Sequence, residues 1–204
     1  MIRKFLIIVL TLVILSGCTV VPKSFQDNFE EYNIGQKAPF GKWKLKQGEF
    51  VITAILSEDK KNLNKVAESI NHGVIYVDEN FSDFMYSVDI KRKEPSDQPR
   101  IYFGLQNNAN SGYYIVLERN DMGYSLYKFN GSEVKLLNRS YSAAPAGTDF
   151  YRYQVVVKGN LIKFFAGGQL YITYRDNSTK AIVGGIGIGY GNGYYDNVRV
   201  EVIS

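Results

Sequence analysis

The chain has 204 residues, of which 22% are charged, and a formal net charge of +4 at pH 7. So small an excess, without a run of basic residues, gives no electrostatic case for binding nucleic acid. The sequence holds 1 cysteine, which excludes a disulfide within the chain, a CxxC redox motif and a cysteine metal cluster. The chain is long enough to form one domain with a substantial core.

The first residues have the layout of a secretory signal. Arg3 and Lys4 precede an apolar run over residues 5–15, and small residues follow it. The run is well short of the ~20 residues that cross a bilayer as a helix. The tetrapeptide that ends at Cys18 (LSGC) resembles the bacterial lipobox. We therefore expect removal of residues 1–17 as a signal peptide and lipidation, with palmitate among the acyl chains, at Cys18.

This signal predicts a lipoprotein of the bacterial cell envelope, with the membrane as partner through its lipid anchor. Several acyl chains on one cysteine anchor a protein stably where a single chain would not. Thr19 follows the cysteine where an aspartate would resemble a signal for inner-membrane retention, so we expect the outer membrane in a host with two membranes. After Cys18, residues 19–24 form a tether that reaches about 25 Å at most.

From Phe25 onward the sequence predicts successive strands. Apolar and polar residues alternate over residues 83–93 and over Arg100–Gln106. Three later pairs of apolar runs are joined by short turns of the kind that hairpins prefer, at residues 130–131, 159–160 and 167–168. This spacing predicts an all-β, antiparallel two-sheet jelly-roll sandwich over residues 25–203, with its first and last strands adjacent.

One segment departs from the strand pattern. Residues 57–70 are charged and place four apolar residues at helical spacing: Leu63, Val66, Ala67 and Ile70. We predict a short helix or an ordered loop here, covering one edge of the sandwich.

The glycine-rich residues 184–193 (GGIGIGYGNG) invite comparison with a nucleotide-binding loop. The GxGxxG spacing is not met, and the strand–turn–helix context of a dinucleotide site is missing. We predict a glycine-rich strand in which Ile186 and Ile188 pack inward and the glycines allow close approach.

Short motifs follow one another in a definite order along the mature sequence. They are residues 25–29 (FQDNF), Trp43, and residues 48–51, 73–76, 81–84, 110–114, 151–168, 185–187 and 195–200. Together they resemble the concanavalin A-like lectin and glucanase superfamily, and within it the 3-keto-disaccharide hydrolase and LamG-like type of domain. The resemblance implies a jelly roll, a fold that carries lectins, glucanases, lyases and inert adhesion modules alike.

The resemblance also implies a structural calcium site that ties the chain ends together. In similar domains the aspartate of the closing strand often joins such a site, with oxygens from the first strand and an early glycine-rich turn. Carried over, this gives Asp196 as the side-chain ligand, Asp27 as a second candidate and the carbonyl of Gly48. Oxygen donors of this kind suit Ca²⁺. The alternative is that Asp196 only caps a turn beside Asn197.

Catalytic residues are not predicted. Retaining glucanases of this superfamily carry paired carboxylates as ExDxxE on one strand, and that spacing is absent here. The GxSxG elbow of many hydrolases is absent too. His72 is the only histidine of the sequence. A catalytic base or metal site at this position would therefore have no second histidine to act with it.

A polar and aromatic face is predicted on two consecutive strands. We expect the core to be filled by Ile101, Phe103, Leu105, Ile115 and Leu117. Alternation then places the residues between them on the opposite face of the same sheet, namely Arg100, Tyr102, Gln106, Tyr114 and Glu118. Aromatic rings and oriented hydrogen-bonding groups suit a glycan, with Tyr102 and Tyr114 as stacking rings, although Arg100 and Glu118 are also placed for a simple ion pair. Alanine variants of the two tyrosines are expected to fold.

Three functions remain open on the sequence alone. The first is an envelope lipoprotein that binds a glycan or polysaccharide. The second is a hydrolase acting on oligosaccharides, as the resemblance to 3-keto-disaccharide hydrolases implies. The third is a structural or protein-binding lipoprotein without catalysis.

Overall fold

The structure, a computed structural model, describes residues 24–56, 62–142 and 149–203, so the predicted signal and Cys18 lie outside it. Within these ranges the chain forms thirteen strands and one 3-10 turn, η1 (Arg119–Asp121), and no helix there is long and apolar enough to cross a membrane. The strands are β1 (Phe25–Asp27), β2 (Trp43–Leu56), β3 (Leu63–Ser82), β4 (Phe84–Arg92), β5 (Arg100–Gln106), β6 (Ser111–Leu117), β7 (Tyr124–Asn130), β8 (Glu133–Ser140), β9 (Tyr151–Lys158), β10 (Leu161–Ala166), β11 (Gln169–Arg175), β12 (Val183–Gly189) and β13 (Gly193–Val202).

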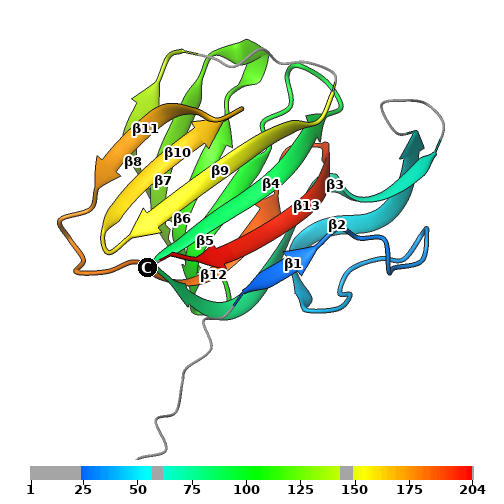
Figure 1. The fold of residues 1–204 in the computed structure, drawn as a ribbon, viewed down its shortest axis with the longest axis horizontal. Coiled ribbons are helices and arrows are strands. Elements are labelled where there is room, and N and C mark those ends of the chain that lie inside the picture. The colour runs from blue at the N-terminus through cyan, green and yellow to red at the C-terminus, as the bar shows by residue number, and fades with distance from the viewer. Residues whose placement is uncertain (1–23, 57–61, 143–148, 204) are drawn as a thin grey trace, which may run out of the picture.

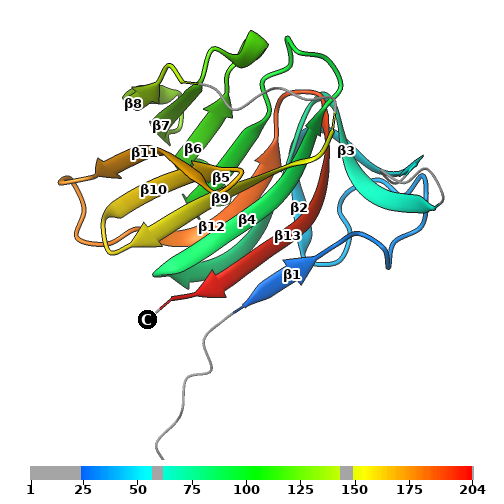
Figure 2. The same ribbon diagram turned by 45° about the horizontal axis from the view of Figure 1, so that its top comes forward.

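The strands pack as two layers, visible in Figures 1 and 2. The front sheet has the order β11–β10–β9–β4–β13, with β1 paired to β13, and the back sheet has the order β3–β12–β5–β6–β7–β8. Strand β3 joins the two, because its first part pairs with β13 and its second part with β12. All these pairs are antiparallel, which confirms the predicted two-sheet jelly-roll sandwich.

Strand β3 bends at Asn71 and His72, where φ is 50° and 57°. Before the bend, its residues 63–70 pair with the second half of β2. The predicted helix or loop is therefore wrong for residues 63–70, while residues 57–61 lie outside the described part. Helical spacing is a weak local preference, and pairing with β2 overrides it by burying Val66 and Ala67 completely.

The main core lies between the two sheets. Ile101, Phe103, Ile115 and Leu117 all belong to it, as predicted, together with Trp43 and the two isoleucines of β12. The glycine-rich segment is thus a strand, and its isoleucines are 0% exposed. The predicted hairpins β7–β8, β9–β10 and β10–β11 are also confirmed, and Phe25 of the first strand lies opposite Val200 of the last.

Leu105 is a correction to the predicted core. It packs on the outer face of the back sheet rather than between the sheets. The cause is Gly104, which has a φ of 58° and lies where the pairing of β5 with β6 shifts register. A bulge of this kind adds one residue to the strand, so every side chain beyond it changes face. Alternation therefore holds from Arg100 to Phe103 and fails afterwards.

Candidate functional site

A row of tyrosines crosses the outer face of the back sheet. Tyr102 of β5 lies opposite Tyr114 of β6, which lies opposite Tyr127 of β7. On the other side of β5 the row continues through Gly187 of β12 to Tyr76 of β3. Residues directly opposite on antiparallel strands project from the same face. Tyr102 and Tyr114 are therefore neighbours, as the alternation predicts, with ring centres 5.4 Å apart.

This row forms part of a second apolar cluster. Tyr102 and Tyr114 are each 7% exposed, and Leu105 and Phe129 pack with them. Burial raises the pKa of Tyr102 to about 12, although Arg100 beside it acts in the opposite direction. The two tyrosines point away from the main core, but they are packed side chains and not the open stacking plates expected from the sequence.

Arg100 connects this row to a stack of planar groups. Its Cζ atom lies 3.3 Å from the ring centre of Tyr190 and 4.8 Å from that of Tyr114. The His72 ring contacts that of Tyr190, with 5.0 Å between ring centres, and the Tyr127 ring contacts that of Tyr114 at 5.1 Å. We call these five residues the planar stack. His72 is exposed and Tyr190, Arg100 and Tyr127 are half-buried, so solvent reaches both ends of it.

The backbone holds one end of the planar stack in an unfavourable conformation. Tyr190 has a φ of 76° and His72 a φ of 57°. Left-handed backbone at such residues costs about 1–3 kcal/mol and is concentrated at functional sites. The Tyr190 amide donates to the Gly73 carbonyl at 2.6 Å, and the Tyr190 carbonyl lies 2.9 Å from Nδ1 of His72. These bonds fix the Tyr190 ring over Arg100.

Glu118 is not the partner of Arg100. It is 7% exposed and lies just after β6. Its carboxylate accepts hydrogen bonds from Ser125 at 2.6 Å and from Gln98 at 2.7 Å, and it pairs with Arg139 at 3.3 Å. The ion pair considered between Arg100 and Glu118 is therefore wrong. Glu118 instead positions Arg139 on the rim of the same face.

Gln106 lies at the opposite end of β5 from Arg100. Its Nε2 donates to the carbonyl of Val183 at 2.9 Å. The side chain lines a cavity of about 340 Å³, together with Gly104, Asn107, Ser111, Gly112, Tyr113, Lys128, Phe129, Asn130, Thr179, Ala181, Ile182 and Val183. The cavity is separate from the planar stack. Its amide and hydroxyl groups around an aromatic ring suit a small polar ligand.

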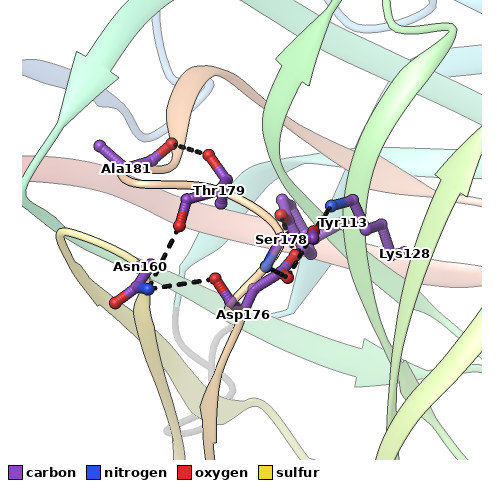
Figure 3. A network of polar contacts seen from close by, with 7 residues as sticks. All are labelled: Tyr113, Lys128, Asn160, Asp176, Ser178, Thr179 and Ala181. Carbon is purple, nitrogen blue, oxygen red and sulfur yellow. Dashed lines mark hydrogen bonds and ion pairs between the residues drawn. The ribbon is translucent and has the colours of Figure 1, made fainter.

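A buried carboxylate holds Tyr113 and Lys128, two residues that line this cavity, and Figure 3 shows the polar contacts around it. Asp176, 4% exposed, accepts hydrogen bonds from the hydroxyls of Tyr113 and Ser178, both at 2.6 Å, and from the Lys128 amino group at 2.8 Å. Burial raises the pKa of Asp176, but the bonds from Lys128, Ser178 and Tyr113 outweigh it and hold the pKa well below its usual range. Sequence reasoning did not find this network.

Asp27, a candidate calcium ligand, organises the segment after β1. Its carboxylate accepts hydrogen bonds from the Trp43 indole at 2.9 Å, the Tyr32 hydroxyl at 2.7 Å and the Phe29 amide at 2.8 Å. A cavity of about 430 Å³ lies beside it, lined also by Glu31 and other residues of this segment. Both carboxylate oxygens therefore already have protein donors.

Asp196, the other candidate side-chain ligand, is buried on β13. Burial, together with the nearby carboxylates of Asp89, Glu30 and Asp27, raises its pKa to about 6, although the hydrogen bond from the Asn197 amide acts in the opposite direction. Its side chain accepts a hydrogen bond from the Asn197 amide at 2.7 Å, as in the turn-capping alternative. Gly48 lies at the bend of β3, against the backbone of residues 71 and 73. The described part of the chain holds no group of three or more His, Cys, Asp or Glu placed to bind a metal, and the calcium stays a prediction.

Comparison with known families decides what kind of domain this is. Residues 24–201 match the model of a family described as the 3-keto-alpha-glucoside-1,2-lyase-like domain. The chain belongs to this family. An uncharacterized protein of Methanocaldococcus jannaschii is 66% identical over 188 residues, which is 92% of this chain and 84% of that relative.

Solved structures are similar to this 3-keto-alpha-glucoside-1,2-lyase-like domain in fold. The carbohydrate binding module CBM66 of Bacillus subtilis matches with a TM-score of 0.61 and 18% identity, over 80% of this chain and 97% of that one. A β-glucanase of Bacillus licheniformis matches with a TM-score of 0.53 and 16% identity, over 88% and 98% of the two chains. At these identities the likeness shows the fold alone.

Three tyrosines on the outer face of the back sheet of this 3-keto-alpha-glucoside-1,2-lyase-like domain were not predicted from the sequence, namely Tyr127, Tyr76 and Tyr190. Alternation along residues 124–130 would have placed Tyr127 on the same face as Ser125. Tyr76 lies in a strand that is buried on both sides and shows little alternation. Tyr190 has no local signal, because its place depends on a left-handed backbone that the sequence does not announce.

Proposed function

We propose that the chain binds a carbohydrate on the outer face of its back sheet, at the planar stack. The observation that carries this proposal is the continuous contact of planar side chains from His72 through Arg100 to Tyr127 on one sheet face. A tyrosine ring offers an apolar face to the C–H groups of a sugar and a hydroxyl to its oxygens. The names of the structural neighbours, a carbohydrate binding module and a β-glucanase, support the same ligand class.

Tyr127 at one end of the stack and Tyr190, next to His72 at the other end, make the contact in this proposal. Tyr127 and Tyr190 have ring surface open to solvent, whereas Tyr102 and Tyr114 are nearly covered. The two predicted stacking rings therefore support the binding surface from below, and Arg100 donates hydrogen bonds from its place between Tyr190 and Tyr114.

Removing the Tyr127 ring should weaken glycan binding while the protein stays folded. A stacked aromatic ring contributes about 1–3 kcal/mol through apolar burial, so Tyr127→Ala should bind roughly tenfold to a hundredfold more weakly. The measurement is a titration of full-length protein in detergent with a ligand first found on a glycan array. Tyr194→Ala is the matched control, since Tyr194 is also half-buried but lies on β13 of the front sheet.

Each result of this titration has a clear reading. Equal affinity of the two variants and the parent would place the site elsewhere, with the cavity beside Gln106 as the next candidate. An array without any bound glycan would contradict carbohydrate binding and favour a structural or protein-binding role.

The family description favours a lyase as the second candidate function. Elimination from a 3-keto-glycoside removes the proton on the carbon beside the ketone and expels the group bonded to the next carbon, so it needs a base for that proton and a proton donor for the leaving group. His72, the only histidine of the sequence, lies at the exposed end of the planar stack and is the candidate base. Analysing the same glycan mixtures for cleaved products separates this candidate from simple binding.

We also propose that the chain is an envelope lipoprotein anchored through Cys18. The apolar run, the lipobox-like tetrapeptide and the short interval between Cys18 and Phe25 support this. In a bacterial expression host that lipidates such signals, metabolic labelling with palmitate should mark the parent protein and leave Cys18→Ala unlabelled. Equal labelling of both would contradict the anchor, and Cys18→Ala must be detected at a similar level by antibody.

A further inference from the structure

Arg100 is a cation without a counter-charge among the residues that the structure describes. Within residues 24–56, 62–142 and 149–203 no carboxylate lies at ion-pair distance from its guanidinium, and its Nε is buried without a hydrogen-bond partner. Its contacts are the rings of Tyr190 and Tyr114 and the hydroxyl of Tyr102. Arg139 on the same face also has a buried Nε without a partner, but its guanidinium pairs with Glu118.

Cation–π contact alone is a weak replacement for a carboxylate partner. Contacts of this kind stabilise a cation less than a hydrogen-bonded carboxylate does. The rings of Tyr190 and Tyr114 lie against the guanidinium, and no carboxylate of the described residues pairs with its terminal N–H groups. A carboxylate meets the edge of a guanidinium with two parallel hydrogen bonds, which is the geometry that distinguishes arginine from lysine.

A second cation on this face also lacks an acidic partner. The Lys46 amino group contacts the Ala109 carbonyl and lies 5.4 Å over the ring of Phe129, which belongs to the same apolar cluster as Tyr114. Burial lowers the pKa of Lys46. Among the described residues no carboxylate pairs with it, so the outer face of the back sheet carries two uncompensated positive groups.

We propose that the glycan bound at the planar stack is acidic, and that Arg100 binds the carboxylate of a uronic acid between Tyr190 and Tyr114. This inference rests on the proposed carbohydrate binding and specifies its ligand class. A neutral sugar would cover the two cations without compensating their charge, whereas a uronate supplies the missing anion and still presents C–H groups to Tyr127 and Tyr190. The left-handed backbone at Tyr190 holds the ring that orients the guanidinium before the ligand arrives.

The test compares each acidic polysaccharide with its own uncharged form. Full-length protein in detergent is run by affinity electrophoresis through alginate or polygalacturonate, and through the same polymers after chemical reduction of their carboxyl groups. Dextran and dextran sulfate form a further pair. We expect the parent to bind at least one polyuronate about tenfold or more tightly than its reduced form, since a charged hydrogen bond contributes about 1.5–3 kcal/mol.

Variants assign the preference to Arg100. Arg100→Gln should lose the preference and bind the acidic and reduced polymers alike. Arg100→Lys keeps the charge but not the planar fork, and should recover less than about a tenth of the parent affinity for polyuronate. Arg199→Gln removes one positive charge from the front sheet, where Arg199 pairs with Glu201, and should bind as the parent does. Thermal unfolding confirms that each variant is folded.

The failures are distinguishable. Equal binding of acidic and reduced polymers would overturn the acidic ligand and leave carbohydrate binding intact. A preference for polyuronate that survives in Arg100→Gln would overturn the role of Arg100. Retention by dextran sulfate alone would overturn the carboxylate in favour of a sulfate ester. Absence of binding to any polymer, together with an empty glycan array, would overturn both proposals.

Discussion

Asp176→Asn should destabilise the protein by about 2–3 kcal/mol at neutral pH, in the range for losing hydrogen bonds to a buried charged group. The carboxylate receives bonds from two strands of the back sheet, through Tyr113 of β6 and Lys128 of β7. The Asn side chain has the same shape but carries no charge and offers one carboxamide oxygen in place of two. It therefore leaves Lys128 without its counter-charge. Urea unfolding at pH 7 measures the difference.

The same substitution should change how stability depends on pH. The hydrogen bonds lower the pKa of Asp176 in the folded protein below its unfolded value. A group of this kind stabilises the fold at any pH above its unfolded pKa of about 4, and that contribution is lost as the pH falls towards the folded pKa. The parent should therefore lose more stability than Asp176→Asn between neutral pH and strong acid.

Asp78→Asn is the matched control for both measurements. Asp78 also pairs with a lysine, Lys44 at 2.7 Å, but its side chain is 42% exposed. Exposed ion pairs contribute about 0.2–1 kcal/mol, so this variant should unfold within that margin of the parent. If Asp176→Asn proved no more costly than Asp78→Asn, the network would be a surface arrangement without a structural role.

The parts of the fold that sequence reasoning found are those where local patterns and long-range pairing agree. Residues 84–92 alternate strictly between buried and half-buried, so their strand and its inward face follow from the sequence. The hairpin turns at Gly131 and Gly159 have φ near 60°, which is the conformation that their glycines allow. At these positions the backbone conformation that the local sequence favours is the one that the folded protein requires.

The predictions of the fold that were wrong are those in which contacts with another strand override the local sequence pattern. Gly104 carries a left-handed φ inside β5, which turns Leu105 away from the face that alternation assigns to it. The charged residues 63–70 look helical alone, and only the partner strand β2 makes them extended. Neither effect is visible in a window of sequence, because each depends on atoms contributed by another strand.

The candidate site also has a part that the sequence predicts and a part that it does not. The neighbourhood of Tyr102 and Tyr114 follows from two consecutive strands and a short loop, and it was predictable. Tyr190 reaches Arg100 only because β12 pairs with both β3 and β5 and the chain then turns through a strained residue. The residue that completes the planar stack therefore comes from the segment in which sequence reasoning saw only a glycine-rich strand.

Tyr102→Ala should destabilise the fold by about 2–4 kcal/mol, near the cost of deleting a buried aromatic ring elsewhere. Its ring lies 5.4 Å from that of Tyr114 and 6.2 Å from that of Phe129, and it is 7% exposed. Deletion would leave a cavity in the apolar cluster that supports the planar stack. The sequence predicts only that the variant folds, and the burial of the ring adds this cost in stability. Urea unfolding with matched m-values measures the cost.

Tyr102→Phe separates packing from hydrogen bonding at this position. It keeps the ring and removes the hydroxyl that interacts with Arg100, so it should cost less than about 1.5 kcal/mol, the net value of one ordinary hydrogen bond. A large loss in Tyr102→Ala with a small one in Tyr102→Phe would show that the buried ring is a support for the binding surface. A Tyr102→Ala variant as stable as the parent would show instead that the ring is uncovered in solution. Tyr102 would then itself be free to stack on a sugar, and the contact would move from the rim of the face to its centre.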